Sequence, residues 1–130
     1  MEEVYLDLPS LVTTWLLEGG TAWLEPFGPQ PKKIPPKLKY SPGTIVHFES
    51  NRKWKAQVKT VSCLRIKDSG WEIIAKTGFP EILNESLSLI EKKYLTESFY
   101  NQFEEIYPGS LKKNPWVYFI TIKDIKTTAS

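Results

Sequence analysis

A proline-rich stretch is the feature that most limits how this chain can fold. Six of the ten prolines lie between positions 26 and 43. Proline has no backbone N–H and a fixed φ, so neither a helix nor an interior strand can run through such a stretch. We therefore expect an extended loop over about 26–43. The chain of 130 residues has the size of one domain, so 1–130 is predicted to be a single domain containing that loop.

Three elements are predicted before the loop. Val4, Leu6 and Leu8 alternate with polar residues, which indicates a first strand. Helical spacing relates Leu11, Thr14, Trp15 and Glu18, with Ser10 as the expected N-cap and the glycines at 19 and 20 as the stop. Residues 21–25 are predicted to form a second strand.

Two strands are predicted directly after the loop. The first covers 44–49, and the second begins near Lys53 after a break at 50–52. Alternation on the second strand puts Trp54, Ala56 and Val58 on one face, with Lys53, Lys55, Gln57 and Lys59 on the other. Val61 and Cys63 share the parity of the lysines. Either a bulge intervenes there or both faces become covered.

The C-terminal half is predicted to hold a strand over 71–75, two helices and a last strand over 116–125. Leu83, Leu87, Ile90 and Tyr94 define the first helix. The second begins at Thr96 as a cap and ends at Pro108–Gly109, with Phe99, Phe103 and Ile106 on its apolar face. The last strand is apolar on both faces, so it is expected inside the sheet.

These elements predict an α+β fold. Strands and helices are grouped rather than alternating, which favours a mostly antiparallel curled sheet or a small β-barrel of five to six strands with about three helices.

Composition excludes several classes of site. Cys63 and His47 are the only cysteine and histidine, so a disulfide framework and a zinc site are not expected, and no cofactor is predicted. The N-terminus is acidic, and no apolar run approaches the length of a membrane span. We expect a cytoplasmic monomer or weak dimer with no membrane partner.

Positive charge is concentrated between Lys32 and Lys67. Residues 31–67 carry ten lysines and arginines against the single acid Glu49, although the net charge is only +2. Such asymmetry concerns partners rather than fold. A solvated lysine-rich face is one interpretation. Aromatic residues interleaved with the charges favour the other, a surface that faces nucleic acid.

Two short runs resemble a known superfamily. The first is Leu-Leu-Glu-Gly-Gly-Thr-Ala-Trp-Leu-Glu over 16–25, and the second is Lys-Tyr-Ser-Pro-Gly-Thr-Ile-Val-His-Phe over 39–48. Together with paired helices ahead of a last apolar strand, they resemble the PUA-like superfamily, closest to ASCH and EVE-type domains and related small archaeal proteins. The resemblance implies a cleft that holds a base or nucleoside.

The resemblance also implies which residues would line that cleft. ASCH domains usually read G-x-K-x-x-E-x-R over the first run, and alignment on Gly20 matches Glu25 to the glutamate. Ala22 and Phe27 stand at the lysine and arginine positions, so the lysine of the family's amidohydrolases is absent. This departure favours binding over catalysis, with Glu25 as the only weak catalytic candidate.

The sequence therefore predicts a module that binds RNA or single-stranded DNA, with a flipped or modified base in the cleft. Lysines and arginines would hold phosphates, aromatic rings would stack on a base, and Glu25 would accept a hydrogen bond from its edge. For Trp23 and Phe27, the alternative to base stacking is that their rings belong to the hydrophobic core. The candidate residues are Trp23, Glu25, Phe27, Lys32, Lys33, Lys37, Lys39, Tyr40, Arg52, Lys53 and Lys55. The alternatives are a small nucleoside-processing amidohydrolase using Glu25 and a protein-interaction domain.

Overall fold

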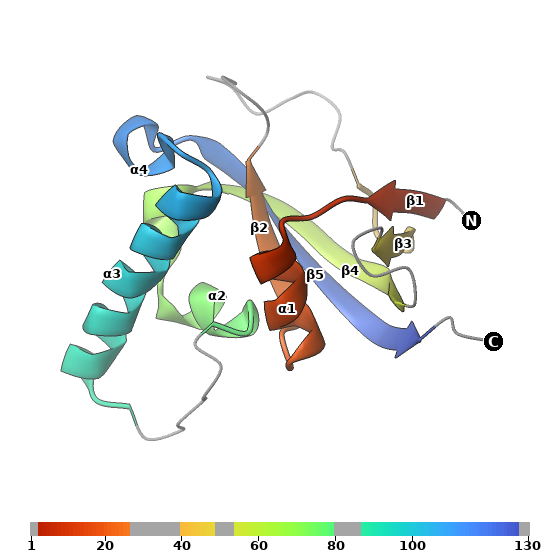
Figure 1. Ribbon diagram of the computed structural model, residues 1–130, viewed down its shortest axis with the longest axis horizontal. Coiled ribbons are helices and arrows are strands. Elements are labelled where there is room, and N and C mark those ends of the chain that lie inside the picture. The colour runs from red at the N-terminus through yellow and green to blue at the C-terminus, as the bar shows by residue number, and fades with distance from the viewer. Residues whose placement is uncertain (1–2, 27–39, 49–53, 80–86, 128–130) are drawn as a thin grey trace.

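The computed structural model describes residues 3–26, 40–48, 54–79 and 87–127. Within these ranges, strands and helices follow one another along the chain as shown in Figure 1. The strands are β1 (Glu3–Leu6), β2 (Ala22–Pro26), β3 (Ile45–Phe48), β4 (Trp54–Arg65) and β5 (Trp116–Thr127). The helices are α1 (Ser10–Leu17), the 3-10 helix η2 (Ile66–Asp68), α2 (Trp71–Lys76), α3 (Leu89–Ile106) and α4 (Ser110–Lys113). None of the described helices is long and apolar enough to cross a membrane.

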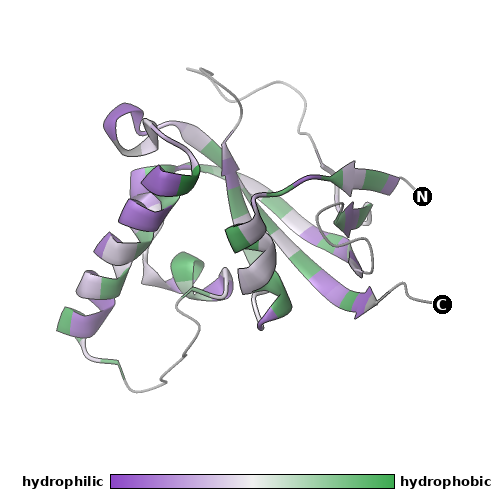
Figure 2. Cartoon of the chain, in the orientation of Figure 1, coloured by the Kyte–Doolittle hydropathy of each residue, from purple (hydrophilic) through white to green (hydrophobic). Residues whose placement is uncertain are grey.

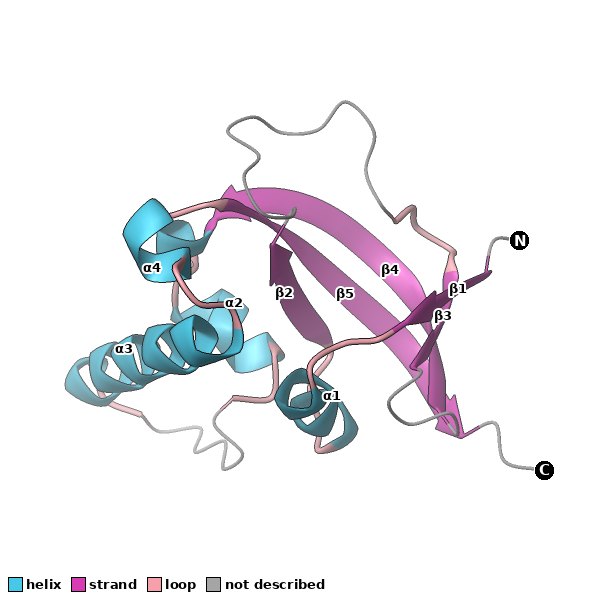
Figure 3. Cartoon of the chain, turned by 45° about the horizontal axis from the view of Figure 1, so that its top comes forward, coloured by secondary structure: helices cyan, strands magenta, loops and turns pink. Residues whose placement is uncertain are grey.

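The five strands form one mixed sheet in the order β1-β3-β4-β5-β2. β1 and β3 are parallel, and the other three pairs are antiparallel. The sheet is strongly curved but leaves β1 and β2 as edges in the described part of the chain (Figure 3). The α+β prediction with a curled, mostly antiparallel sheet is confirmed, whereas the closed-barrel alternative is wrong. β5 has strands on both sides, as its two apolar faces predict.

The predicted irregularity in β4 is present. The pairing of β4 with β5 shifts register between Lys55 and Gln57 and again between Val58 and Thr60. Beyond the second shift, Val61 and Cys63 pack against the same apolar cluster as Val58. The extra residue changes the parity of the strand, so the bulge interpretation is confirmed.

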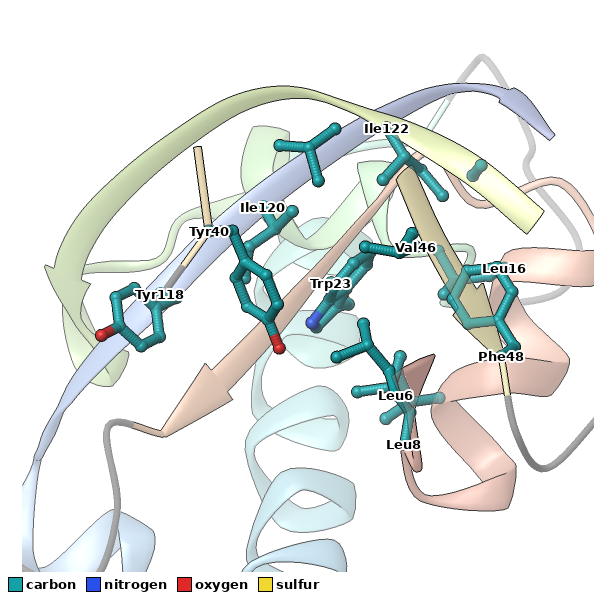
Figure 4. Close-up of a cluster of buried hydrophobic side chains, with 13 residues drawn as sticks. Leu6, Leu8, Leu16, Trp23, Tyr40, Val46, Phe48, Tyr118, Ile120 and Ile122 are labelled. Carbon is teal, nitrogen blue, oxygen red and sulfur yellow. The ribbon is translucent and has the colours of Figure 1, made fainter. Parts of the chain in front are cut away.

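Apolar residues gather in two clusters on opposite faces of the sheet. The inner cluster lies under the curve of the sheet against α1 and includes Trp23, Tyr40 and Ile120 (Figure 4). The outer cluster joins alternate residues of β2 and β5, such as Leu24 and Val117, to α2 and α3. α1 contributes side chains to both clusters, because Leu16 belongs to the inner cluster and Trp15 to the outer one.

Residues 71–76 are helical, so the strand predicted over 71–75 is wrong. α2 buries Ile74 in the outer cluster and packs Trp71 and Ile73 at its margin. A short apolar run fits a strand and one and a half helical turns equally well, and here packing against α3 selects the helix.

Residues 89–106 form one continuous helix where two were predicted. Ser88 caps α3 by a reciprocal capping box with Glu91. Thr96 lies inside the helix, and its hydroxyl donates to the Lys92 carbonyl (2.7 Å) instead of capping a new one. Leu83 lies outside the described residues. The helix ends just before Pro108–Gly109 as predicted, and the short α4 that follows was not predicted.

The start of α1 also differs from prediction by one residue. Ser10 is the first helical residue, and the N-cap is Pro9, which makes no side-chain capping bond. Instead the Pro9 carbonyl accepts the Thr13 backbone N–H at 3.1 Å.

Candidate nucleic-acid interface

Most of the candidate residues lie outside the described part of the chain. These are Phe27, Lys32, Lys33, Lys37, Lys39, Arg52 and Lys53. Five of them belong to residues 27–39, the part of the predicted proline-rich loop that is outside the described ranges. The structure places Trp23, Glu25, Tyr40 and Lys55. It brings the first three together in the interior and puts Lys55 on the surface at the other end of the sheet.

The interior group, here called the Glu25 cluster, consists of Trp23, Glu25, Tyr40, Tyr107 and Tyr118. The Tyr40 hydroxyl donates to Glu25 Oε1 at 2.9 Å and lies 3.2 Å from Oε2. The Tyr40 ring packs edge-on between those of Trp23 and Tyr118, at centroid distances of 6.1 and 6.2 Å (Figure 4). Glu25 and Tyr118 are Cα partners across β2 and β5. The sheet register thus fixes the carboxylate, and Tyr40 is held on it by a charge-assisted hydrogen bond.

Trp23 is buried, with 1% of its surface exposed, and its ring contacts the edges of Tyr40 and Phe48. The core interpretation of Trp23 therefore describes this structure, and the base-stacking interpretation does not, because neither ring face reaches solvent. Within the described residues, the Trp23 indole Nε1 is a buried donor without a hydrogen-bond partner. It points to the side on which the Tyr40 hydroxyl lies (Figure 4).

Burial and the nearby carboxylate act on two tyrosines of the Glu25 cluster. Burial raises the pKa of Tyr40 well above its usual value, and the charge of Glu25 and the hydrogen bond to it raise it further. Burial and the Glu25 charge likewise raise the pKa of Tyr107. Both hydroxyls are therefore neutral donors at physiological pH, and neither can serve as a general base.

These shifted pKa values predict a loss of stability in alkali. Above pH 10, the ordinary pKa of tyrosine, the unfolded chain loses these protons while the folded protein keeps them, so stability falls as pH rises. The free energy of unfolding is expected to fall by about 1 kcal/mol per tyrosine between pH 10 and 11. Urea unfolding measured from pH 8 to 11 tests this, with Tyr40→Phe as control. A Tyr40→Phe curve as steep as the wild-type curve would contradict the assignment.

Lys55 belongs to a set of exposed lysines on the outer face of the sheet. We call Lys55, Lys59, Lys123 and Lys126 the lysine face; all four are exposed. Lys55 and Lys126 are Cα partners across β4 and β5, and Gln57 is the partner of Lys123. Residues next to them in sequence, Ala56, Val58 and Ile122, are buried in the inner cluster. The four lysines therefore share the opposite side of the sheet. Figure 2 shows hydrophilic stretches on the parts of β4 and β5 that lie near β1 and the C-terminus.

Like charges opposite one another across a strand pair destabilise a sheet. Within the described ranges, none of these four lysines lies in an ion pair with an acidic side chain. Lys123 and Lys126 were not among the predicted site residues, because only the strand register places them beside Lys55. The available signal was that apolar Ile122 and Ile125 each stand directly before one of these lysines.

A groove adjoins the lysine face where β5 passes the end of α1. Its volume is about 410 Å³, and its walls include Leu17, Trp54, Ile122 and Lys123. Trp54 is half-buried against the inner cluster, so part of its ring belongs to the core and part to the groove. Lys123 is common to the groove and the lysine face.

The described residues offer little for metal or thiol chemistry. They contain no group of three or more His, Cys, Asp and Glu side chains that could hold a metal ion. Burial raises the pKa of the half-buried Cys63 thiol, which lowers its thiolate fraction and its nucleophilicity.

Comparison with solved structures identifies the class of fold. The ASCH domain from Lactobacillus crispatus JV V101 superimposes with a TM-score of 0.57 at 10% identity, covering 98% of this chain and 80% of that one. A point mutant of the Zymomonas mobilis ASCH protein gives 0.52 at 10% identity, covering 96% and 70%. The hypothetical protein PH0355 gives 0.51 at 20% identity, covering 98% and 99%.

The chain therefore has an ASCH/PUA-like fold, as the two sequence runs predicted. At these identities the likeness concerns fold alone. No protein-family model matches the sequence, and no curated protein is detectably similar to it.

Proposed function

We propose that this protein is a nucleic-acid-binding module that holds the phosphates of RNA or single-stranded DNA on the lysine face. One observation carries the proposal: the sheet register places Lys55 directly opposite Lys126, both exposed and neither in an ion pair within the described residues. Lys123 lies one step along the same strand pair, opposite the neutral Gln57.

The physical reason is that the positive charges of the lysine face repel one another unless an anion neutralises them. Two lysines directly opposite one another repel, at a cost of roughly 0.2–1 kcal/mol to the sheet. A polyanion removes this repulsion and gains further because binding releases its condensed counterions. Lysine suits this role because its ammonium attracts a phosphate without demanding one geometry. We propose the same phosphate-binding role for the basic candidate residues outside the described ranges, from Lys32 to Lys53.

Glu25 is the second part of the proposal, as the acceptor for the edge of a flipped or modified base. Its carboxylate already accepts a hydrogen bond from Tyr40, so an entering base would replace that hydroxyl with an N–H donor of its own. Among the described residues, the Trp23 Nε1 has no hydrogen-bond partner, and this supports the proposal because it offers a donor to an acceptor atom on the same base.

The test is direct binding of a labelled single strand of about 12 nucleotides, which is within the usual range of site sizes. Fluorescence anisotropy at low salt is expected to show saturable binding. A plot of log affinity against log salt should be linear, with a slope of about −0.7 for each phosphate held. Absence of binding to both RNA and DNA strands at low salt would refute the proposal.

A further inference from the structure

Tyr5 is a large aromatic residue exposed on the edge strand β1. It is 64% exposed, although Leu6 beside it is buried in the inner cluster. Its ring stacks on His47 of β3, with the centroids 4.6 Å apart and the planes 16° from parallel. His47 Nε2 is in turn 3.2 Å from Glu3 Oε1. One face of the Tyr5 ring is thus supported by a positioned imidazole, and the exposure of the residue leaves the other face open.

The register of the sheet aligns this pair with the lysine face. Tyr5 is the Cα partner of His47, His47 is the partner of Lys55, and Lys55 is the partner of Lys126. Partners in a sheet point to the same side, so the four side chains form one row across β1, β3, β4 and β5. With strands about 4.8 Å apart, the row is about 14 Å long.

The row combines the two elements that single-strand-binding surfaces use. These are cationic side chains that follow the phosphates and an aromatic ring on which a base can stack. The bases of a duplex are stacked on one another and paired, so they do not present a face to a ring on a protein surface. An exposed ring beside lysines therefore discriminates between the two forms.

We infer that Tyr5 is the base-stacking platform of this surface and that its partner is single-stranded nucleic acid with an unpaired base. His47 supports the ring from behind, and Lys55 and Lys126 hold the phosphates that follow. This inference rests on the proposed function and adds to it the form of nucleic acid and the residue that selects it.

The test compares Tyr5→Ala with the wild type on two probes, a single strand of about 12 nucleotides and the same sequence as a duplex. The variant is expected to bind the single strand about 5- to 150-fold more weakly, the range found for removal of one stacked base, and to bind the duplex unchanged. A single strand carrying 2-aminopurine adds a direct readout, because its fluorescence is quenched when the base stacks.

Two further variants serve as controls. Tyr94 is 69% exposed on α3, and that helix lies on the opposite side of the molecule from β1 and the C-terminus (Figure 1). Tyr94→Ala therefore removes a similarly exposed ring and should change neither affinity. Tyr5→Phe keeps the ring and should bind the single strand as the wild type does.

The outcomes separate this inference from the proposed function. If the wild type binds single strands with the expected salt slope and Tyr5→Ala matches it in affinity and quenching, the stacking inference is overturned while the proposed function stands. Equal weakening for both probes would also overturn it, since a stacking ring acts only on the single strand. If the wild type binds neither probe, both fall.

Discussion

Reversing Lys55 and Lys126 together to glutamate is expected to weaken binding of a single strand by about 100-fold or more at low salt. Each lysine that holds a phosphate releases part of a counterion, which is worth about tenfold in affinity near 50 mM salt. The reversal removes two such lysines and adds repulsion. The slope of log affinity against log salt should also become shallower by about 1.4, or about 0.7 for each phosphate that is no longer held.

The chain offers a matched control for this experiment. Lys112 and Lys113 are exposed on α4, at the opposite end of the molecule from β1 and the C-terminus (Figure 1). Their double reversal changes the net charge from +2 to −2, as the double reversal at Lys55 and Lys126 does. If the proposal is correct, the control keeps most of its affinity. Equal weakening in both variants would mean that net charge, rather than the lysine face, governs binding.

The single variant Lys55→Glu separates an effect on folding from an effect on binding. Lys55→Glu alone puts a carboxylate opposite Lys126, which replaces a repulsive cross-strand pair with an attractive one. The sheet should become slightly more stable while the affinity for nucleic acid falls. A gain in stability together with a loss of affinity would show that Lys55 contributes to nucleic-acid binding and not to the stability of the fold.

The sequence predicted the strands because their patterns are local. Alternation identified β4 and showed a change of parity near Val61 that left a bulge or two covered faces as alternatives. Two apolar faces identified β5 as an interior strand. It failed where long-range packing chooses between two local possibilities. The run at 71–76 is a helix that packs against α3. Residues 89–106 form one helix, in which the Thr96 hydroxyl donates to the Lys92 carbonyl instead of capping a second helix.

The candidate interface shows the same division between local and long-range information. A count of charges along the chain located the positive region at 32–67, but the lysine face joins Lys55 and Lys59 to two lysines about 65 residues further along. Tyr5 could not be predicted either, since its place in the row depends on the parallel pairing of β1 with β3. The resemblance located Glu25, whereas its burial beneath Tyr40 follows only from the three-dimensional structure.

The largest expected effect on stability comes from substituting Gly78, where the backbone after α2 lies against the backbone that leads from α1 to β2. Gly78 follows α2 with φ +86, and a Cβ there would lie 2.3 Å from the Trp15 carbonyl oxygen and 3.2 Å from Gly20 Cα. Both neighbours are backbone atoms, which cannot move aside as the end of a side chain could. Gly78→Ala is therefore expected to lower the free energy of unfolding by about 3–5 kcal/mol, from the strained φ and the overlap together.

Gly109 separates these two causes. It has nearly the same φ, +89, but a Cβ there would meet nothing within 4 Å. Gly109→Ala should therefore cost only the strain of the left-handed conformation, about 1–2 kcal/mol. Urea denaturation of both variants measures the difference, provided that the m-value is unchanged. Equal destabilisation would show that the backbone beside Trp15 can yield. A larger effect for Gly78→Ala would show that the backbone of Trp15 and Gly20 cannot move aside, so that only glycine fits at this contact.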